Sequence, residues 1–125
     1  MALSGSSQGT VRHAALAGAD LSAKQGYLCK LSSGALQLAG NGERGFPLAD
    51  KPESGQVGTI ILSGKAKVLV GTGGITEMGS VAAEAGGAVV AAATGDIVCG
   101  TALETAAAGA YAMILVAQAG GIVAA

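Results

Sequence analysis

The chain has 125 residues, a formal net charge of −1 and only 12% charged residues, which are scattered singly along it. Nucleic-acid binding needs a clustered basic surface and, for single strands, aromatic rings on which bases stack. The chain has no tryptophan, one phenylalanine and two tyrosines, so we expect no nucleic-acid partner.

Small side chains dominate the expected core. Alanine and glycine make up well over a third of the chain, and the aromatic residues are limited to Tyr27, Phe46 and Tyr111. A single domain of this length can bury roughly two-thirds of its unfolded surface. However, alanine gains far less free energy on burial than leucine or phenylalanine, and ordered glycine costs backbone entropy. We therefore expect self-association to supply part of the stability.

Residues 1–19 are rich in serine, glycine and alanine and show little hydrophobic periodicity. They lack the basic start and the apolar run of a secretory signal peptide. We predict an extended N-terminal arm that becomes ordered on a partner, with Val11 and Leu16 as its anchors. A short helix over 13–17 is the alternative. Residues 20–125 are then a single β domain.

Short apolar segments separated by glycine turns begin at residue 26. The Asn41-Gly42 pair favours a tight turn because it tolerates the positive φ that hairpins need. Pro47 suits an edge strand, since proline cannot donate a ladder hydrogen bond. The pattern predicts strands over 27–31, 35–38 and 46–48, followed by a polar loop at 50–55.

The middle of the chain predicts a hairpin of two strands, 56–62 and 65–70, joined by the turn Ser63-Gly64. In the second strand alternate side chains are alanine and valine, whereas Lys65 and Lys67 point to the other face. The lysines are then a solvated strand face, or they meet acidic residues of a partner chain.

Turn signals continue at 71–74, and extended segments are predicted over 75–81 and 88–92. The best helix candidate is 82–85, which a glycine pair ends. Because turn signals recur about every eight to twelve residues, the sequence predicts an all-β fold, a small antiparallel β-barrel or sandwich.

A closing hairpin is predicted over 95–117. Its second strand is apolar on both faces: Tyr111, Met113 and Leu115 share one face, and Ile114 and Val116 share the other. An antiparallel strand with one face in water should alternate apolar with polar residues. We therefore expect one face to pack in the core and the other against a second subunit, and we assign these five residues to inter-subunit contacts.

The nearly uncharged C-terminal stretch from 106 to 125 has the length of a membrane span. It consists mostly of alanine and glycine, with Gln118 and the Gly120-Gly121 pair inside. A strand followed by a tail is therefore the favoured interpretation, and we expect no membrane partner.

Few residues suggest chemistry. His13 is the only histidine, and a catalytic triad would need it held by a buried acid. The 71–74 loop resembles a phosphate-binding loop, but no helix pattern follows it. Isolated acids could act in acid–base catalysis, although such residues are usually solvated. They are Glu77, Glu84, Asp96 and Glu104. We expect no enzyme activity.

Cys29 and Cys99 lie on predicted strands far apart in the sequence. Free cysteine often behaves as a small buried apolar residue. A disulfide is the alternative, but it is not needed if the chain is made in a bacterial cytoplasm. Metal binding would need more ligands than these two thiols and one imidazole. We therefore expect no metal and no other cofactor.

The order of these segments resembles the capsid decoration, or head cement, proteins of tailed bacteriophages. The resemblance is one of pattern and order, carried by glycine turns and apolar strands. It covers the segments 26–31, 34, 45–48, 54–68, 73–76, 92–104 and 111–116.

The resemblance implies an all-β protein, often trimeric, that binds the major capsid protein at local three-fold positions outside an icosahedral head and stabilises the shell. It implies synthesis in the host cytoplasm, location in the virion and no catalytic residues. The residues that we assign to capsid contact are Ala2, Leu3, Val11, Arg12, Phe46 and Pro47. The alternative is a small β module that binds a ligand or carbohydrate in a phage fibre or cell-surface protein, which would need an aromatic-lined pocket.

Overall fold

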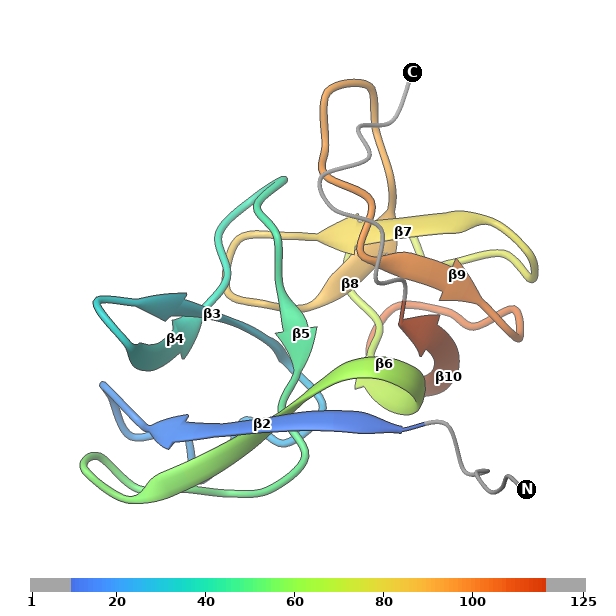
Figure 1. Cartoon of the computed structure of the whole chain (residues 1–125). Coiled ribbons are helices and arrows are strands. Elements are labelled where there is room, and N and C mark those ends of the chain that lie inside the picture. Colours follow the sequence, from blue (N-terminus) through green and yellow to red (C-terminus); the bar gives the residue numbers. More distant parts are fainter. Residues whose placement is uncertain (1–9, 117–125) are drawn as a thin grey trace.

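The computed structural model describes residues 10–116, and this part of the chain contains β-strands and turns without a helix (Figure 1). The strands are β2 (Val11–Leu16), β3 (Leu28–Ser32), β4 (Ala35–Leu38), β5 (Phe46–Pro47), β6 (Val57–Leu69), β7 (Ser80–Ala83), β8 (Val89–Ala91), β9 (Gly100–Ala102) and β10 (Tyr111–Val116). The described residues accordingly include no helix long and apolar enough to cross a membrane.

Two sheets form the fold. The larger has six strands in the order β2-β6-β10-β9-β7-β8, and the smaller has three in the order β4-β3-β5. All the strand ladders are antiparallel. The prediction of a small all-β sandwich or barrel-like fold is therefore confirmed.

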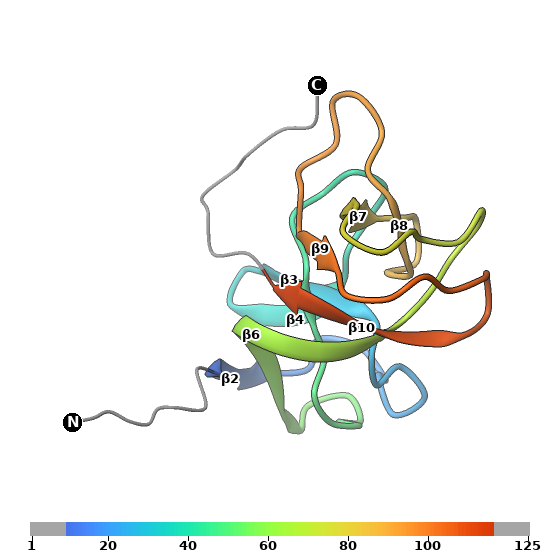
Figure 2. The same cartoon turned by 90° about the vertical axis from the view of Figure 1, so that its right-hand side faces the viewer.

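The long strand β6 joins the two halves of the large sheet. Its first part, from Val57 to Ser63, pairs with β2, and its second part, from Gly64 to Leu69, pairs with β10. Figure 2 shows β6 bending between these two parts.

The predicted hairpin with a turn at Ser63-Gly64 is wrong, because β6 runs through these residues as one strand. The register shifts here, since Val11 pairs with Ser63 whereas Arg12 pairs with Ile61. Gly64 has a φ of 110°, which side chains with a Cβ rarely adopt. A bulge with an adjacent glycine bends a strand without ending it, so the same residues that suggest a turn form a bend.

Two apolar clusters fill the interior, and β6 contributes to both. Ile60 packs in the smaller cluster with Leu36 and Leu48, whereas the next residue, Ile61, packs in the larger one. Successive side chains of a strand point to opposite faces, so β6 is covered on both sides here. The larger cluster is built mainly from valine and alanine, as the composition predicts.

The expected N-terminal arm is part of the sheet over much of its described length. Val11–Leu16 is extended, as predicted, but it forms β2 and pairs with β6 of the same chain. Ala17 is buried in the smaller cluster, so the β domain includes residues before the predicted boundary at 20. The alternative helix over 13–17 is wrong. Residues 1–9 lie outside the described part.

Most other predicted strands are present with small shifts in their bounds, but of the predicted extended segment 75–81 only Ser80 and Val81 belong to a strand. The helix candidate at 82–85 is wrong, because Ala82 and Ala83 belong to β7. These alanines are fully buried between neighbouring strands. Alanine has low intrinsic strand propensity, but its small side chain fits a strand that is covered on both faces.

Candidate interaction face

Strand β10 presents one face to the core and one to the surface. Ile114 is 0% exposed and Val116 is 3% exposed, so both belong to the core of their own chain. Their assignment to inter-subunit contacts is therefore corrected: the core occupies their side chains. Tyr111 and Leu115 are 50% and 45% exposed and Met113 is half-buried. For these three residues, contact with another chain remains a prediction.

Basic residues lie directly beside this outer apolar face. Met113 pairs with Lys67 across the β6–β10 ladder, and Leu115 pairs with Lys65. Both lysines are exposed, whereas Ala66 between them is buried. Directly paired side chains of neighbouring strands are close enough to interact. The face is therefore mixed apolar and basic, not purely apolar as the sequence of β10 alone predicts.

An open groove of about 650 Å³ begins on this face. Arg12, Lys51, Lys65 and Lys67 line it, which is four of the seven lysines and arginines of the chain. No aspartate or glutamate is among the lining residues. We call this feature the basic groove; its apolar part is formed by Pro47, Leu48, Ala49, Ile61, Ala66, Tyr111 and Met113. The groove has one aromatic ring, that of Tyr111, which does not match the aromatic-lined pocket expected for a carbohydrate module.

The predicted capsid-contact residues are not all at the surface. Val11 is 45% exposed, and Arg12 is exposed on β2 and lines the basic groove. Phe46 is half-buried, but Pro47 is below 2% exposed. Pro47 is thus largely covered but forms part of the inner wall of the groove, and its contact with the capsid remains a prediction. The other two, Ala2 and Leu3, lie outside the described residues.

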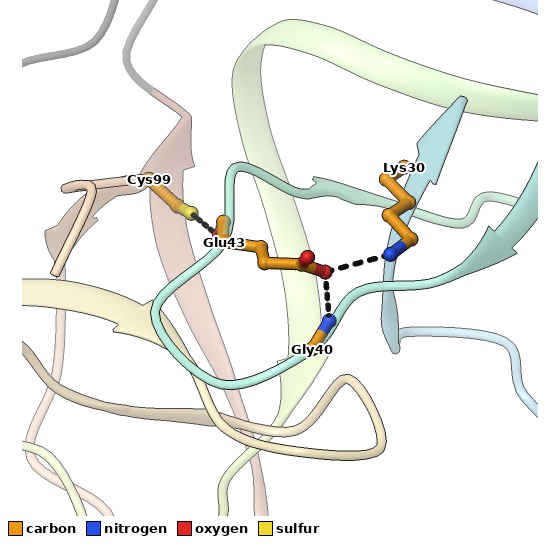
Figure 3. A network of polar contacts seen from close by, with 4 residues as sticks. All are labelled: Lys30, Gly40, Glu43 and Cys99. Carbon is orange, nitrogen blue, oxygen red and sulfur yellow. Dashed lines mark hydrogen bonds and ion pairs between the residues drawn. The ribbon is translucent and has the colours of Figure 1, made fainter. Parts of the chain in front are cut away.

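A second, smaller depression of about 490 Å³ includes Leu31, Arg44 and Phe46. Its charges are partly paired, since Lys30 Nζ lies 2.8 Å from Glu43 Oε1 (Figure 3). The same oxygen accepts a hydrogen bond from the Gly40 N–H at 2.6 Å. The bond from Lys30 and the bond from Gly40 hold the pKa of Glu43 below its ordinary value. An acid therefore offsets part of the positive charge in this depression, whereas none does so in the lining of the basic groove.

Most acidic side chains hold turns in place. The Asp96 carboxylate accepts the Ala93 N–H, and Glu104 accepts the Met113 N–H at 2.8 Å. Glu84 accepts the Thr72 N–H, so an acid of the chain itself occupies the loop that resembles a phosphate site. Asp20, Glu43 and Asp50 likewise accept backbone N–H groups.

The residues considered for catalysis are thus placed at separate positions. His13 is exposed on β2, and the Glu77 N–H donates to Thr105 Oγ1. Within residues 10–116, no group of three or more histidine, cysteine or acidic side chains could hold a metal ion.

Cys29 and Cys99 are free and buried, as predicted. Burial raises the pKa of the Cys29 thiol to about 12 and also raises that of Cys99. The Cys99 thiol lies 3.7 Å from the Glu43 carbonyl oxygen (Figure 3). A cysteine reacts as the thiolate and needs access to solvent. Both thiols are buried and protonated at neutral pH, so we regard them as unreactive packing residues.

We expect neither thiol to react with a disulfide reagent at mildly alkaline pH until denaturant is added. Because the folded-state pKa of Cys29 is raised from 9.0 to about 12, the thiol contributes stability that is fully present below pH 9.0 and is lost as the pH rises toward 12. A Cys29→Ala variant should show a smaller alkaline decline in its free energy of unfolding. Rapid labelling of the native chain would contradict the placement of both thiols.

Comparison with known proteins finds a similar fold among solved structures but no match by sequence. No protein-family model matches the chain. No curated protein matches it by sequence. Among solved structures it is similar to the head fibre gp8.5 N base of bacteriophage phi29, with a TM-score of 0.69 and 19% identity. The match covers 88% of this chain and 96% of that one.

The chain shares its fold with a phage head fibre base. At 19% identity the likeness concerns the fold and does not transfer residue roles. It extends over nearly the whole of both chains, so it includes both sheets and not only one hairpin. The exposed face of β10 and the basic groove are therefore interpreted from the side chains of this chain alone.

Proposed function

We propose that this protein is a structural component of a bacteriophage virion that binds the outside of the capsid as a homotrimer and stabilises the shell. The observation that carries the proposal is the fold likeness to a phage head fibre base over 88% of the chain. The order of strands and turns in the sequence independently resembles capsid decoration proteins.

Exposed apolar side chains support attachment to other chains. Leu16 and Val57 are paired across the β2–β6 ladder and are 54% and 63% exposed. Leu115 is also exposed and lies outside the basic groove. Contiguous exposed apolar side chains mark contact surfaces, whereas single ones are ordinary. We assign the Leu16–Val57 pair to contacts between copies in the trimer, and the groove to contact with the shell.

A trimer would strengthen attachment through multivalency. When one subunit has bound, the other two meet their sites at a high effective concentration. Three modest contacts can then give tight attachment. A protein that binds only the assembled shell stabilises it by mass action, by about 2.7 kcal/mol for each site at a hundredfold excess over Kd.

The test adds purified protein to mature heads that lack it and measures binding by sedimentation and the rupture temperature by light scattering. We expect saturable binding and a higher rupture temperature. The chain alone should scatter light as a compact trimer. Competition by an excess of unlabelled protein, which should displace labelled protein from saturable sites only, separates specific binding from adsorption. A monomeric chain that neither binds heads nor raises their rupture temperature would refute the proposal.

A further inference from the structure

The basic groove concentrates positive charge in a chain whose net charge is −1. We propose that it binds an extended acidic segment of a different protein, with carboxylates on Lys65 and Lys67 and an apolar side chain over Ile61 and Met113. The inference rests on the proposed function only for the location of that protein, which is the capsid shell.

The spacing of the two lysines on β6 indicates the spacing of the acidic residues in the ligand. Lys65 and Lys67 are two residues apart on one strand, so they share a face and are separated by roughly 7 Å. An extended segment has the same repeat, so acidic residues two positions apart in a partner match the two ammonium groups. Arg12 and Lys51 add charge from β2 and from the polar loop after β5.

The bend in β6 brings these groups together. Ile61 precedes the bulge and Lys65 follows Gly64, and both line the groove. No acid in the lining neutralises the four cations. This contrasts with the second depression, where Glu43 pairs with Lys30. An uncompensated cluster of this kind attracts an anionic partner and orients it during encounter.

The apolar lining favours a polypeptide over a nucleic acid. A single-stranded nucleic acid would stack its bases on several rings, whereas Tyr111 is the only aromatic residue in the lining. Aliphatic side chains and the Met113 thioether instead suit the apolar residues of an acidic peptide, and lysine stems can pack on such residues while their ammonium groups bind carboxylates.

The chain itself offers a poor occupant. Residues 1–9 and 117–125 contain no aspartate or glutamate. Six of the eight acidic side chains hold separate turns through backbone N–H groups. A second copy would thus present its acids one at a time and not as the spaced pair that the lysines fit.

The experiment measures binding of the full-length protein to undecorated heads over a series of salt concentrations. The double variant K65E/K67E should bind at least about tenfold more weakly, because it places like charges opposite the partner's acids. The variant K65R/K67R keeps the charge and should bind like the wild type. The single variants K67E and R44E make the same change in net charge as each other. Arg44 does not line the groove, so R44E should change affinity less than about twofold, whereas K67E should weaken binding more.

A second arm tests the groove without heads. A short synthetic peptide that alternates glutamate with alanine is titrated into the isotopically labelled protein, with the glutamine counterpart as control. We expect the glutamate peptide alone to shift the amide signals of Lys65 and Lys67 and the methyl signal of Met113. If the wild type fails to bind heads but binds this peptide, the proposed function fails and the groove assignment stands.

Three results would overturn the assignment. One is that K67E binds heads as tightly as R44E does. Another is that a single-stranded oligonucleotide binds the groove more tightly than the glutamate peptide. A third is that K65E/K67E abolishes self-association, which would make a second copy the occupant.

Discussion

Replacing Ile114 by alanine is expected to lower the free energy of unfolding by about 2–5 kcal/mol. Ile114 is fully buried in the larger apolar cluster, and it pairs with Ala66 on one side and Ala102 on the other. Both neighbours are small residues on fixed strands, so they cannot move in to fill the cavity. Urea denaturation with an unchanged m-value would measure the loss directly.

The matched control is Leu115→Ala. Leu115 is the next residue on the same strand and points to the opposite face, where it is 45% exposed. Its truncation should cost about 1 kcal/mol or less in the dilute chain. Similar losses for the two variants would show that β10 does not have one buried and one outer face.

Replacing Gly100 by alanine is expected to cost about 3 kcal/mol or more, at the upper end for overpacked sites. A Cβ at this position would collide with the Leu115 carbonyl oxygen and lie 3.4 Å from the Val116 Cα. Gly100 pairs with Val116 on one side and Val81 on the other. The obstructing atoms are backbone in the neighbouring strand, so relief requires breaking the β9–β10 ladder.

Gly73→Ala separates this collision from the conformational effect of losing a glycine. Gly73 has a φ of 86° and open space around the added Cβ. Its replacement should cost only the left-handed backbone penalty, about 1–2 kcal/mol. Thermal denaturation of both variants would show whether Gly100→Ala loses more stability than Gly73→Ala. A Gly100→Ala chain as stable as Gly73→Ala would contradict the close approach of β9 and β10.

Much of the fold could be predicted because local alternation and glycine turns determine it. Ala66, Val68 and Val70 are buried and Lys65 and Lys67 are exposed, as the alternation in this segment predicts. The β9–β10 hairpin is also present, although β9 is shorter than the predicted first strand. In these segments the partner strand is near in sequence, or the residue pattern alone defines the buried face.

The errors arise where the pairing partner is distant in sequence. Ser63-Gly64 has the composition of a hairpin turn, but β2 and β10 are the actual partners of the strand. The two apolar faces of β10 indicate burial on both sides, yet the outer face lies beside Lys65 and Lys67. Nothing within β10 itself specifies these neighbours.

The basic groove could not be predicted for the same reason. Arg12, Lys51 and the two lysines of β6 come from three separate segments. In the sequence they are isolated charges that suggest no cluster. The period-two spacing of Lys65 and Lys67 was the one available signal, and it indicates a shared face without indicating what lies opposite.

The bend of β6 has a consequence for how the protein can be tethered. Val11, the first residue of β2, pairs with Ser63, and Val116, the last residue of β10, pairs with Gly64. The first and last strands of the described chain therefore meet β6 at adjacent residues. A tag or cargo joined ahead of β2 and one joined behind β10 would therefore be attached at neighbouring points of the domain, and a pull on either end would load the middle of β6.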